Sequence, residues 1–182
     1  MSEWNKLIDR VVRLQSVINP FGVEFVERDA FKRFCDGLPH NLSDYSNICI
    51  TGYFSETVRN AIETLAKWEK HVKLICPAFQ TRTKRDSLNI GALKKLGRSG
   101  VGIKFNPRLH ARLLVAHTED SKYGLLLMGS FDFNTECIGL ERYDAGIKTK
   151  HPDLVKSAVT FFDKVWQDSE SVALEEFLAS RK

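Results

Sequence analysis

The sequence predicts a single α/β domain, a sandwich built on a mixed β-sheet. Apolar runs of strand length alternate with helical patterns to the end of the chain. One strand–helix–strand spacing indicates a βαβ unit, and therefore a parallel pair of strands with a right-handed crossover. The 182 residues contain no internal repeat and no low-complexity linker, and they suffice to bury one sizeable core.

The order of the expected elements follows from where apolar periodicity begins and where Gly or Pro interrupts it. Ser55 offers a helix N-cap directly after a buried-strand pattern, and Pro152 suits the first turn of a long amphipathic helix. Residues 1–45 are expected to form a helical extension packed on the same domain as residues 46–182. The expected helices span 3–18, 29–34, 55–70, 87–96, 152–166 and 172–178; the expected strands span 23–28, 47–53, 72–76, 101–105, 113–116 and 125–128, with one more near 143–144; and 37–46 is expected to be loop.

Composition indicates a globular chain without a membrane-spanning segment. Hydrophobic residues make up 43% and charged residues 27%, and no apolar run approaches the roughly 20 residues that a bilayer requires. The charged N-terminus lacks the apolar core of a secretion signal, which predicts a cytoplasmic location and makes a membrane partner unexpected. No cofactor is expected. The cysteines contain no C-x-x-C pair and are interpreted as structural: Cys35, Cys49, Cys76 and Cys137.

The net charge of +4 conceals a basic segment in the middle of the chain. Residues 82–112 carry nine Lys or Arg and one acid, Asp86, so this segment has a charge of +8 and the remainder −4. Any single lysine could simply lie on a solvated helix face, but this concentration of basic residues favours a polyanionic partner. Nucleic acid is the first candidate and anionic lipid the second. Nearby aromatic side chains could stack on bases, with core packing as the alternative and the better one for Phe105. They are Phe79, Phe105, Phe131 and Tyr143.

A candidate site for a phosphate ester lies between residues 109 and 149. His110 and Arg112 stand two apart at the head of an apolar run, so on a strand their side chains would point the same way. A second run ends at Ser130, and a third begins near Asp144. An imidazole can attack phosphorus without a metal ion, a guanidinium can clamp phosphate oxygens, and a carboxylate can orient the imidazole. Each residue alone could be structural, so the order and spacing of the set carry the hypothesis.

This stretch resembles the signature of the phospholipase D-like superfamily, His-x-Lys-(four residues)-Asp followed by Gly-Ser-x-Asn and a downstream acid. His110-Ala111-Arg112 matches its head, and Gly129-Ser130-Phe131-Asp132 matches its second part. Asp144 stands near the position of the acid, and the resemblance extends over residues 46–167. It implies a phospholipase D-like sandwich, in which helices flank both faces of a mixed sheet.

The chain departs from that signature at three positions. Arg112 replaces the lysine, which preserves the charge but not the shape. His117 replaces an Asp that mainly supports structure in the family. Asp132 replaces the Asn, and a carboxylate there repels phosphate unless it is protonated or turned away, so Asn134 is considered as its substitute.

The resemblance implies a metal-independent phosphodiesterase, with a nuclease as the first expectation. Members with one copy of the motif are typically homodimers, in which one histidine attacks phosphorus and its symmetry mate protonates the leaving group. The alternatives are a weak or inactive module that binds nucleic acid or a protein, and a lipid-directed phosphodiesterase. The expected catalytic residues are His110, Arg112, Ser130 and Asp144; the expected substrate-binding residues are Asp132, Asn134, Arg108 and Lys104; and no metal ligand is expected.

Overall fold

The computed structural model describes residues 22–78, 90–119, 123–131, 133 and 144–180, and these residues form one mixed sheet. Its strands are β1 (Val23–Glu27), β2 (Asn47–Thr51), β3 (His71–Pro77), β4 (Gly102–Asn106), β5 (Leu113–His117), β6 (Gly124–Gly129), β7 (Ala145–Thr149) and β8 (Val172–Ala173). They lie in the order β1-β7-β6-β5-β2-β3-β4-β8. The β2–β3 and β3–β4 pairs are parallel and the other pairs antiparallel, so the predicted mixed sheet and βαβ unit are confirmed.

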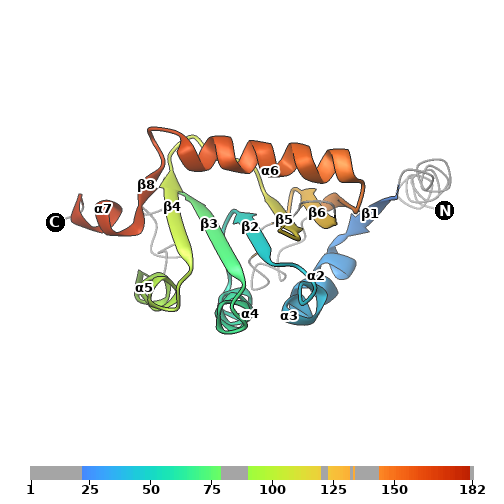
Figure 1. Cartoon of the computed structure of the whole chain (residues 1–182), viewed down its shortest axis with the longest axis horizontal. Helices are drawn as coiled ribbons and strands as arrows, with labels where there is room; N and C mark the ends of the chain where they lie inside the picture. Colours follow the sequence, from blue (N-terminus) through green and yellow to red (C-terminus); the bar gives the residue numbers. More distant parts are fainter. Residues whose placement is uncertain (1–21, 79–89, 120–122, 132, 134–143, 181–182) are drawn as a thin grey trace.

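Helices cover both faces of this sheet, as Figure 1 shows. Helices α2 (Arg28–Asp36), α3 (Leu38–Asn41), α4 (Glu56–Lys67) and α5 (Ile90–Arg98) lie on one face, and α6 (Pro152–Gln167) crosses the other. Helix α7 (Leu174–Ala179) follows β8 at one end of the sheet. The fold class predicted from the sequence is therefore correct. No helix in the described part of the chain combines the length and apolar character needed to cross a bilayer.

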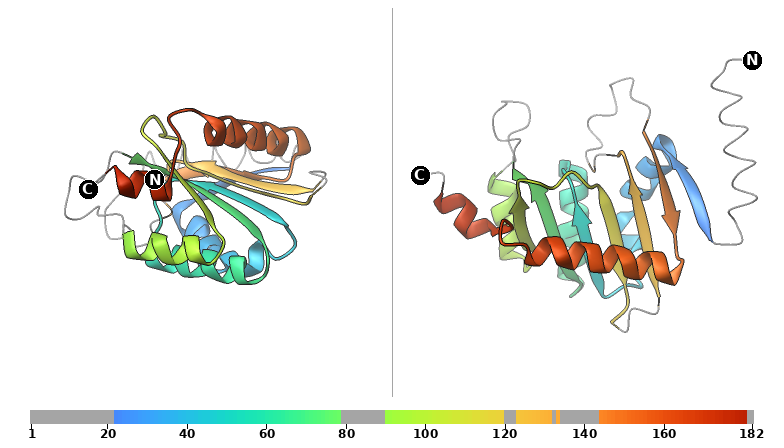
Figure 2. Two further views of the ribbon diagram at one scale, coloured as in Figure 1. Left: turned by 60° about the vertical axis from the view of Figure 1, so that its left-hand side comes forward. Right: turned by 90° about the horizontal axis from the view of Figure 1, so that it is seen from above.

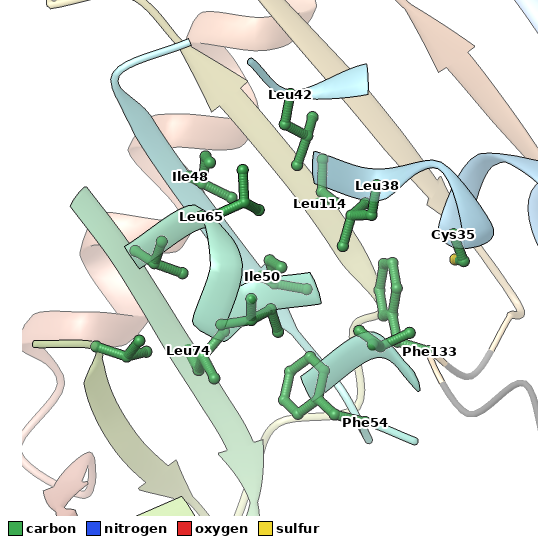
Figure 3. Packing of buried hydrophobic residues seen from close by; sticks show 14 of the residues in the cluster. Cys35, Leu38, Leu42, Ile48, Ile50, Phe54, Leu65, Leu74, Leu114 and Phe133 are labelled. Carbon is green, nitrogen blue, oxygen red and sulfur yellow. The ribbon is translucent and has the colours of Figure 1, made fainter. Parts of the chain in front are cut away.

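The alternation of side chains along each strand divides the core into two clusters. On β6, Leu125 and Leu127 belong to the larger cluster beneath α2–α5, whereas Leu126 belongs to the cluster beneath α6. Figure 3 shows the larger cluster, where Ile50 and Leu114 of the central strands lie close to residues of the covering helices. Both faces of the central strands are therefore buried, which explains why these strands are apolar runs rather than alternating ones.

Most of the expected elements are present, with differences that have local causes. Ser55 caps α4 as predicted, its hydroxyl accepting the N–H of Val58. Residues 37–46 are not all loop, because α3 forms there with a proline in its first turn and with Leu38 buried. Residues 172–173 form β8 beside β4 instead of beginning a helix. The helix expected over 3–18 lies outside the described residues.

Part of the predicted N-terminal extension contributes to the sheet and the core. Strand β1 pairs with β7, with Glu27 opposite Ala145 and Val23 opposite Thr149. Phe31 and Cys35 of α2 are buried in the larger cluster together with the side chains of α4. Residues 22–45 therefore pack as part of the same α/β body as the strands that follow.

One edge of the sheet collects segments that are far apart in the sequence. Strands β4 and β5 are separated in the sheet by β3 and β2, so residues 107–112 pass the carboxyl ends of β3 and β2 before entering β5. Figure 2 shows this crossing from above. Strand β6 ends and strand β7 begins at the same edge, because Gly129 is paired with Gly146. The candidate residues of two connections, β4–β5 and β6–β7, are thus brought to one edge.

Gly129 and Gly146 must be glycines, because the neighbouring backbone and the ring of Phe131 leave no room for a Cβ atom at either position. A Cβ on Gly129 would lie 2.5 Å from the carbonyl oxygen of Ala145, and one on Gly146 would overlap the carbonyl oxygen of Met128 and the ring of Phe131. Phe131 occupies this space and stacks on Phe31, with ring centroids 4.2 Å apart. Packing therefore fixes the backbone on both sides of Ser130.

Candidate active site

The segment that enters β5 carries His110 and Arg112. Leu109, Ala111 and Leu113 pack in the cluster beneath α6, so the two residues that alternate with them are excluded from that core. The common direction of the His110 and Arg112 side chains stays a prediction. The strand itself begins at Leu113, which lies opposite Thr51, the last residue of β2, while Gly129 of β6 still bonds to Arg112 one residue earlier.

His110 and Arg112 differ in their surroundings. His110 is exposed and lines a depression beside α6 with Phe161, Val165 and Asp168. Arg112 is half-buried, and its Cγ lies 3.8 Å from the position that a Cβ of Gly52 would occupy. The alkyl stem of the arginine therefore lies close to the backbone at the end of β2.

Ser130 and Asp144 are joined by a hydrogen bond, in which Ser130 Oγ donates to Asp144 Oδ1 at 2.9 Å. The same hydroxyl accepts the N–H of Ala145 at 3.1 Å. Its one proton is therefore directed at Asp144, and a phosphate oxygen would have to compete for it. The sequence suggested that Asp144 orients the imidazole of His110, whereas the structure gives Asp144 the Ser130 hydroxyl as a partner.

The backbone links this pair to the segment of His110. The N–H of Gly129, the residue before Ser130, donates to the carbonyl oxygen of Arg112 at 3.3 Å. The N–H of Ser130 in turn donates to the carbonyl oxygen of Ala145 at 3.0 Å. The two connections therefore form one hydrogen-bonded edge, on which an imidazole, a guanidinium, a hydroxyl and a carboxylate are presented.

Arg108 and Lys104, both expected to bind substrate, make contacts with α6 and the loop after it. Arg108 Nη2 donates to both carboxylate oxygens of Asp168 at 2.8 and 2.9 Å, and its Nε lies 3.2 Å from Glu170. The backbone N–H of Glu170 and the Arg108 guanidinium hold the pKa of Asp168 below its ordinary value. Lys104 Nζ donates to the carbonyl oxygen of Trp166 at 2.7 Å. Substrate binding by these two cations stays a prediction, since each already has a partner within the protein.

The basic segment does not form a single patch among the described residues. Lys95 on α5 pairs with Glu63 of α4 at 2.7 Å on one face of the sheet, whereas Lys104 contacts α6 on the other. Core packing, the preferred interpretation for Phe105, is confirmed, whereas base stacking is wrong for Phe131, because both rings are buried in the core. The other residues of these expectations lie outside the described part of the chain: Phe79, Arg82, Lys84, Arg85, Asp132, Asn134 and Tyr143.

The described cysteines are structural in their surroundings. Cys35, Cys49 and Cys76 are free and buried, and burial raises the pKa of each thiol to about 12. A thiol with so high a pKa carries almost no thiolate at neutral pH and is a poor nucleophile. Cys137 lies outside the described residues. Within the described ranges, no group of three His, Cys, Asp or Glu side chains is placed to hold a metal ion.

Sequence reasoning missed two residues at this edge. Phe161 is 40% exposed on α6 and lines the depression with His110. The signal for it was present in the sequence, because Phe161 is apolar but falls outside the apolar stripe expected to be buried on this helix. That stripe consists of Leu154, Val155, Ala158, Val159, Phe162, Val165 and Trp166, and the structure leaves Leu154 exposed. Thr51 is fully buried and hydrogen-bonded to the segment of His110. Its sequence position, at the end of an apolar run, gives no such signal.

Comparison with known protein families identifies the class of protein that has this fold. A family model described as the phospholipase D-like domain of cardiolipin synthase matches residues 41–166, which is more than half of the chain. The chain belongs to the phospholipase D-like family. Among curated proteins, none matches the sequence.

Solved structures share the fold at low sequence identity. Nuc from Salmonella typhimurium, a phospholipase D family member, has 14% identity and a TM-score of 0.64, over 83% of this chain and 96% of that chain. NucT from Helicobacter pylori has 15% identity and a TM-score of 0.63, over 83% and 98% of the two chains. TrmBL2, an archaeal chromatin protein, has 13% identity and a TM-score of 0.57, over 92% and 62%. These similarities establish the common fold.

Proposed function

We propose that this protein is a metal-independent phosphodiesterase that cleaves nucleic acid through a phosphohistidine intermediate in a homodimer. The observation that supports this most strongly is the convergence of His110, Arg112 and the Ser130–Asp144 pair at one edge of the sheet. Membership of the phospholipase D-like family supports the same reaction class. The family does not by itself select a substrate, because one fold hosts many activities.

In the proposed reaction, the imidazole of His110 attacks phosphorus, a nitrogen–phosphorus bond forms and the bond to the leaving oxygen breaks. His110 of the second copy protonates that oxygen. Water then attacks the phosphohistidine and gives its proton to the imidazole of the second copy. The nitrogen–phosphorus bond breaks, which releases the phosphate ester and frees the imidazole of His110. Arg112 neutralises charge on the non-bridging oxygens. Asp144 acts as a positioning residue by directing the hydroxyl of Ser130.

Charge and a structural relative favour nucleic acid as the substrate. The +8 charge of residues 82–112 suits a polyphosphate chain. TrmBL2, which shares the fold, is described as binding DNA in a novel mode. A weak or inactive module that binds nucleic acid or a protein partner is the second candidate, because the Ser130 proton is directed at Asp144 and the sequence has Asp132 in place of the signature Asn.

Chelation tests the proposed chemistry directly. Because an imidazole nucleophile requires no metal ion, we expect cleavage of a generic phosphodiester and of labelled single- and double-stranded DNA and RNA to persist in excess EDTA. The measurement is the initial rate with EDTA and with added Mg²⁺. A rate that vanishes in EDTA and returns with Mg²⁺ would contradict the histidine mechanism. Failure to cleave any substrate, with nucleic-acid binding intact, would favour the inactive module.

The dimer is proposed to form over an exposed apolar strip, which consists of Met128, Leu154 and Phe161. Each side chain is between 39% and 44% exposed. Leu154 and Phe161 are seven residues apart on α6 and share a side of the helix. Met128 is two residues from Leu126 on β6, so the two side chains point to the same face of the sheet. The side chain of Leu126 packs beneath α6, and Met128 therefore lies on the face that α6 covers. Phe161 also lines the depression that contains His110. Exposed apolar side chains on one face of a protein are typical of an association surface.

Replacing Phe161 with Asp is expected to weaken the dimer and, with it, the hydrolysis that needs two copies of His110. Burial of a new carboxylate in an apolar contact is unfavourable, so we expect at least a tenfold rise in the dimer dissociation constant, which corresponds to about 1.4 kcal/mol. Sedimentation equilibrium over a range of concentrations measures it. The control is Trp68→Asp, at a 49% exposed aromatic directly after α4, on the other face of the sheet. A Phe161→Asp protein as dimeric as the parent would rule out this surface.

A further inference from the structure

A buried hydroxyl lies where the crossing segment of His110 meets the sheet. Thr51, the last residue of β2, is 0% exposed. Its Oγ1 donates to the carbonyl oxygen of Ala111 at 2.8 Å and accepts the N–H of Leu113 at 3.1 Å. One side chain thus satisfies backbone groups on both sides of Arg112, sixty residues further along the chain.

The Thr51 hydroxyl forms its hydrogen bonds at the point where the backbone pairing of β2 with β5 ends. Thr51 is paired with Leu113, but the next residue, Gly52, has φ of +136° and directs its N–H to the carbonyl oxygen of Ile75 in β3. The N–H of Gly52 thus continues the pairing with β3, while its positive φ ends the extended conformation of β2. Without the Thr51 hydroxyl, the carbonyl of Ala111 and the N–H of Leu113 would lose their hydrogen bonds, which is costly for buried groups.

The other end of the crossing segment is held by a second buried polar side chain. Asn106, which is 2% exposed, accepts the N–H of Arg108 on Oδ1 at 2.8 Å and donates from Nδ2 to Ser171 Oγ at 2.9 Å. His110 therefore lies between two fixed points, one at Asn106 and one at Thr51. The Thr51 contact is the nearer one in sequence, because it begins at the residue after His110.

We propose that Thr51 is a positioning residue for phosphoryl transfer, whose hydroxyl fixes the backbone between His110 and Arg112 so that both side chains address the same phosphate. The inference rests on the proposed function and adds a residue that affects the reaction rate without touching the substrate. The two peptide units flanking Arg112 are oriented by the hydroxyl. Their orientation sets the direction of the Cα–Cβ bond of Arg112 and fixes the chain one residue after His110. Misplacing a reacting group by about 1 Å is enough to lower a rate about a hundredfold.

Thr149 provides a matched control at the opposite end of the sheet. It is 1% exposed, ends β7, and accepts the N–H of His151 on Oγ1 at 3.0 Å. A Thr→Val change at either site removes a buried hydroxyl with little change of volume and leaves backbone groups without a hydrogen bond. General destabilisation should therefore be similar in the two variants, whereas only Thr51 contacts the segment of His110.

The kinetic test compares Thr51→Val, Thr51→Ser and Thr149→Val with the parent on a generic phosphodiester. We expect Thr51→Val to lower kcat about tenfold to a hundredfold while KM changes much less, since substrate still binds but meets a displaced nucleophile. Thr51→Ser retains the hydroxyl and should recover most of kcat. Thr149→Val should leave kcat close to that of the parent. Equal losses of kcat in Thr51→Val and Thr149→Val would overturn the inference.

A second readout separates this inference from the proposed function. In protein with ¹⁵N-labelled histidine, the ring signals of His110 are expected to shift in Thr51→Val and to stay unchanged in Thr149→Val. Amide exchange at Leu113, whose N–H donates to Thr51 Oγ1, is expected to accelerate in the same variant. If the parent cleaves no phosphodiester, the proposed function fails, and these signals still decide the positioning role. Ring signals of His110 that coincide in parent and Thr51→Val would refute it.

Discussion

Replacing His110 with alanine is expected to lower phosphodiester hydrolysis by about a thousandfold or more. In the proposed mechanism the change removes the nucleophile from one copy and the proton donor from the other, so both halves of the reaction are lost at once. The imidazole is exposed and lies outside the cores, so the fold should persist. Initial rates in EDTA measure the effect, and the thermal midpoint verifies that the variant is folded.

The control for this substitution is His71→Ala. His71 is also an exposed histidine, but it begins β3 and therefore lies at the end of the sheet opposite to the candidate site. We expect it to retain the parent rate. A His110→Ala protein that keeps more than about a tenth of the parent rate would show that another group attacks phosphorus.

Replacing Phe162 with alanine is expected to lower the free energy of unfolding by about 3–5 kcal/mol. Phe162 is 0% exposed and belongs to the cluster between α6 and the sheet, together with Ile75 and Leu126 of the central strands. Its ring centroid lies 5.9 Å from that of Trp166, four residues further along the same helix. Its deletion leaves a cavity that two rigid elements cannot close.

Urea unfolding of parent and variant measures this loss, at one protein concentration in both cases. Thr160→Ala, at an exposed position of the same helix, is the control and should change stability by less than about 0.5 kcal/mol. A loss below about 1 kcal/mol in Phe162→Ala would mean that α6 is held to the sheet mainly by other contacts.

Much of the fold could be predicted from the sequence because its signals are local. The runs at 113–116 and 125–128 are apolar at every position, as strands buried on both faces must be, and both became central strands. Ser55 and Pro152 mark helix starts through the geometry of one turn. The short helix α3 was missed because Leu38 is held there by tertiary burial, which outweighs a composition typical of loops.

The contacts of the candidate site could not be predicted in the same way, because they depend on strand order and register. The Ser130–Asp144 bond requires β6 and β7 to be neighbours with Gly129 opposite Gly146. Arg108 meets Asp168 across sixty residues of sequence, and Phe131 is buried against Phe31, a residue one hundred positions earlier. Residue types and spacing indicated the chemistry, and topology decided which partners meet.

The place of β1 in the sheet has a consequence for how the site resists local opening. Asp144 immediately precedes β7, and β7 is an interior strand only because β1 pairs along its outer side from Val23 to Glu27. An outermost strand frays at a much lower free energy than one paired on both sides. The early residues, which from the sequence look like an addition to the domain, thus protect the carboxylate side of the site from fraying, and the outermost position passes to a strand that carries none of the predicted catalytic residues.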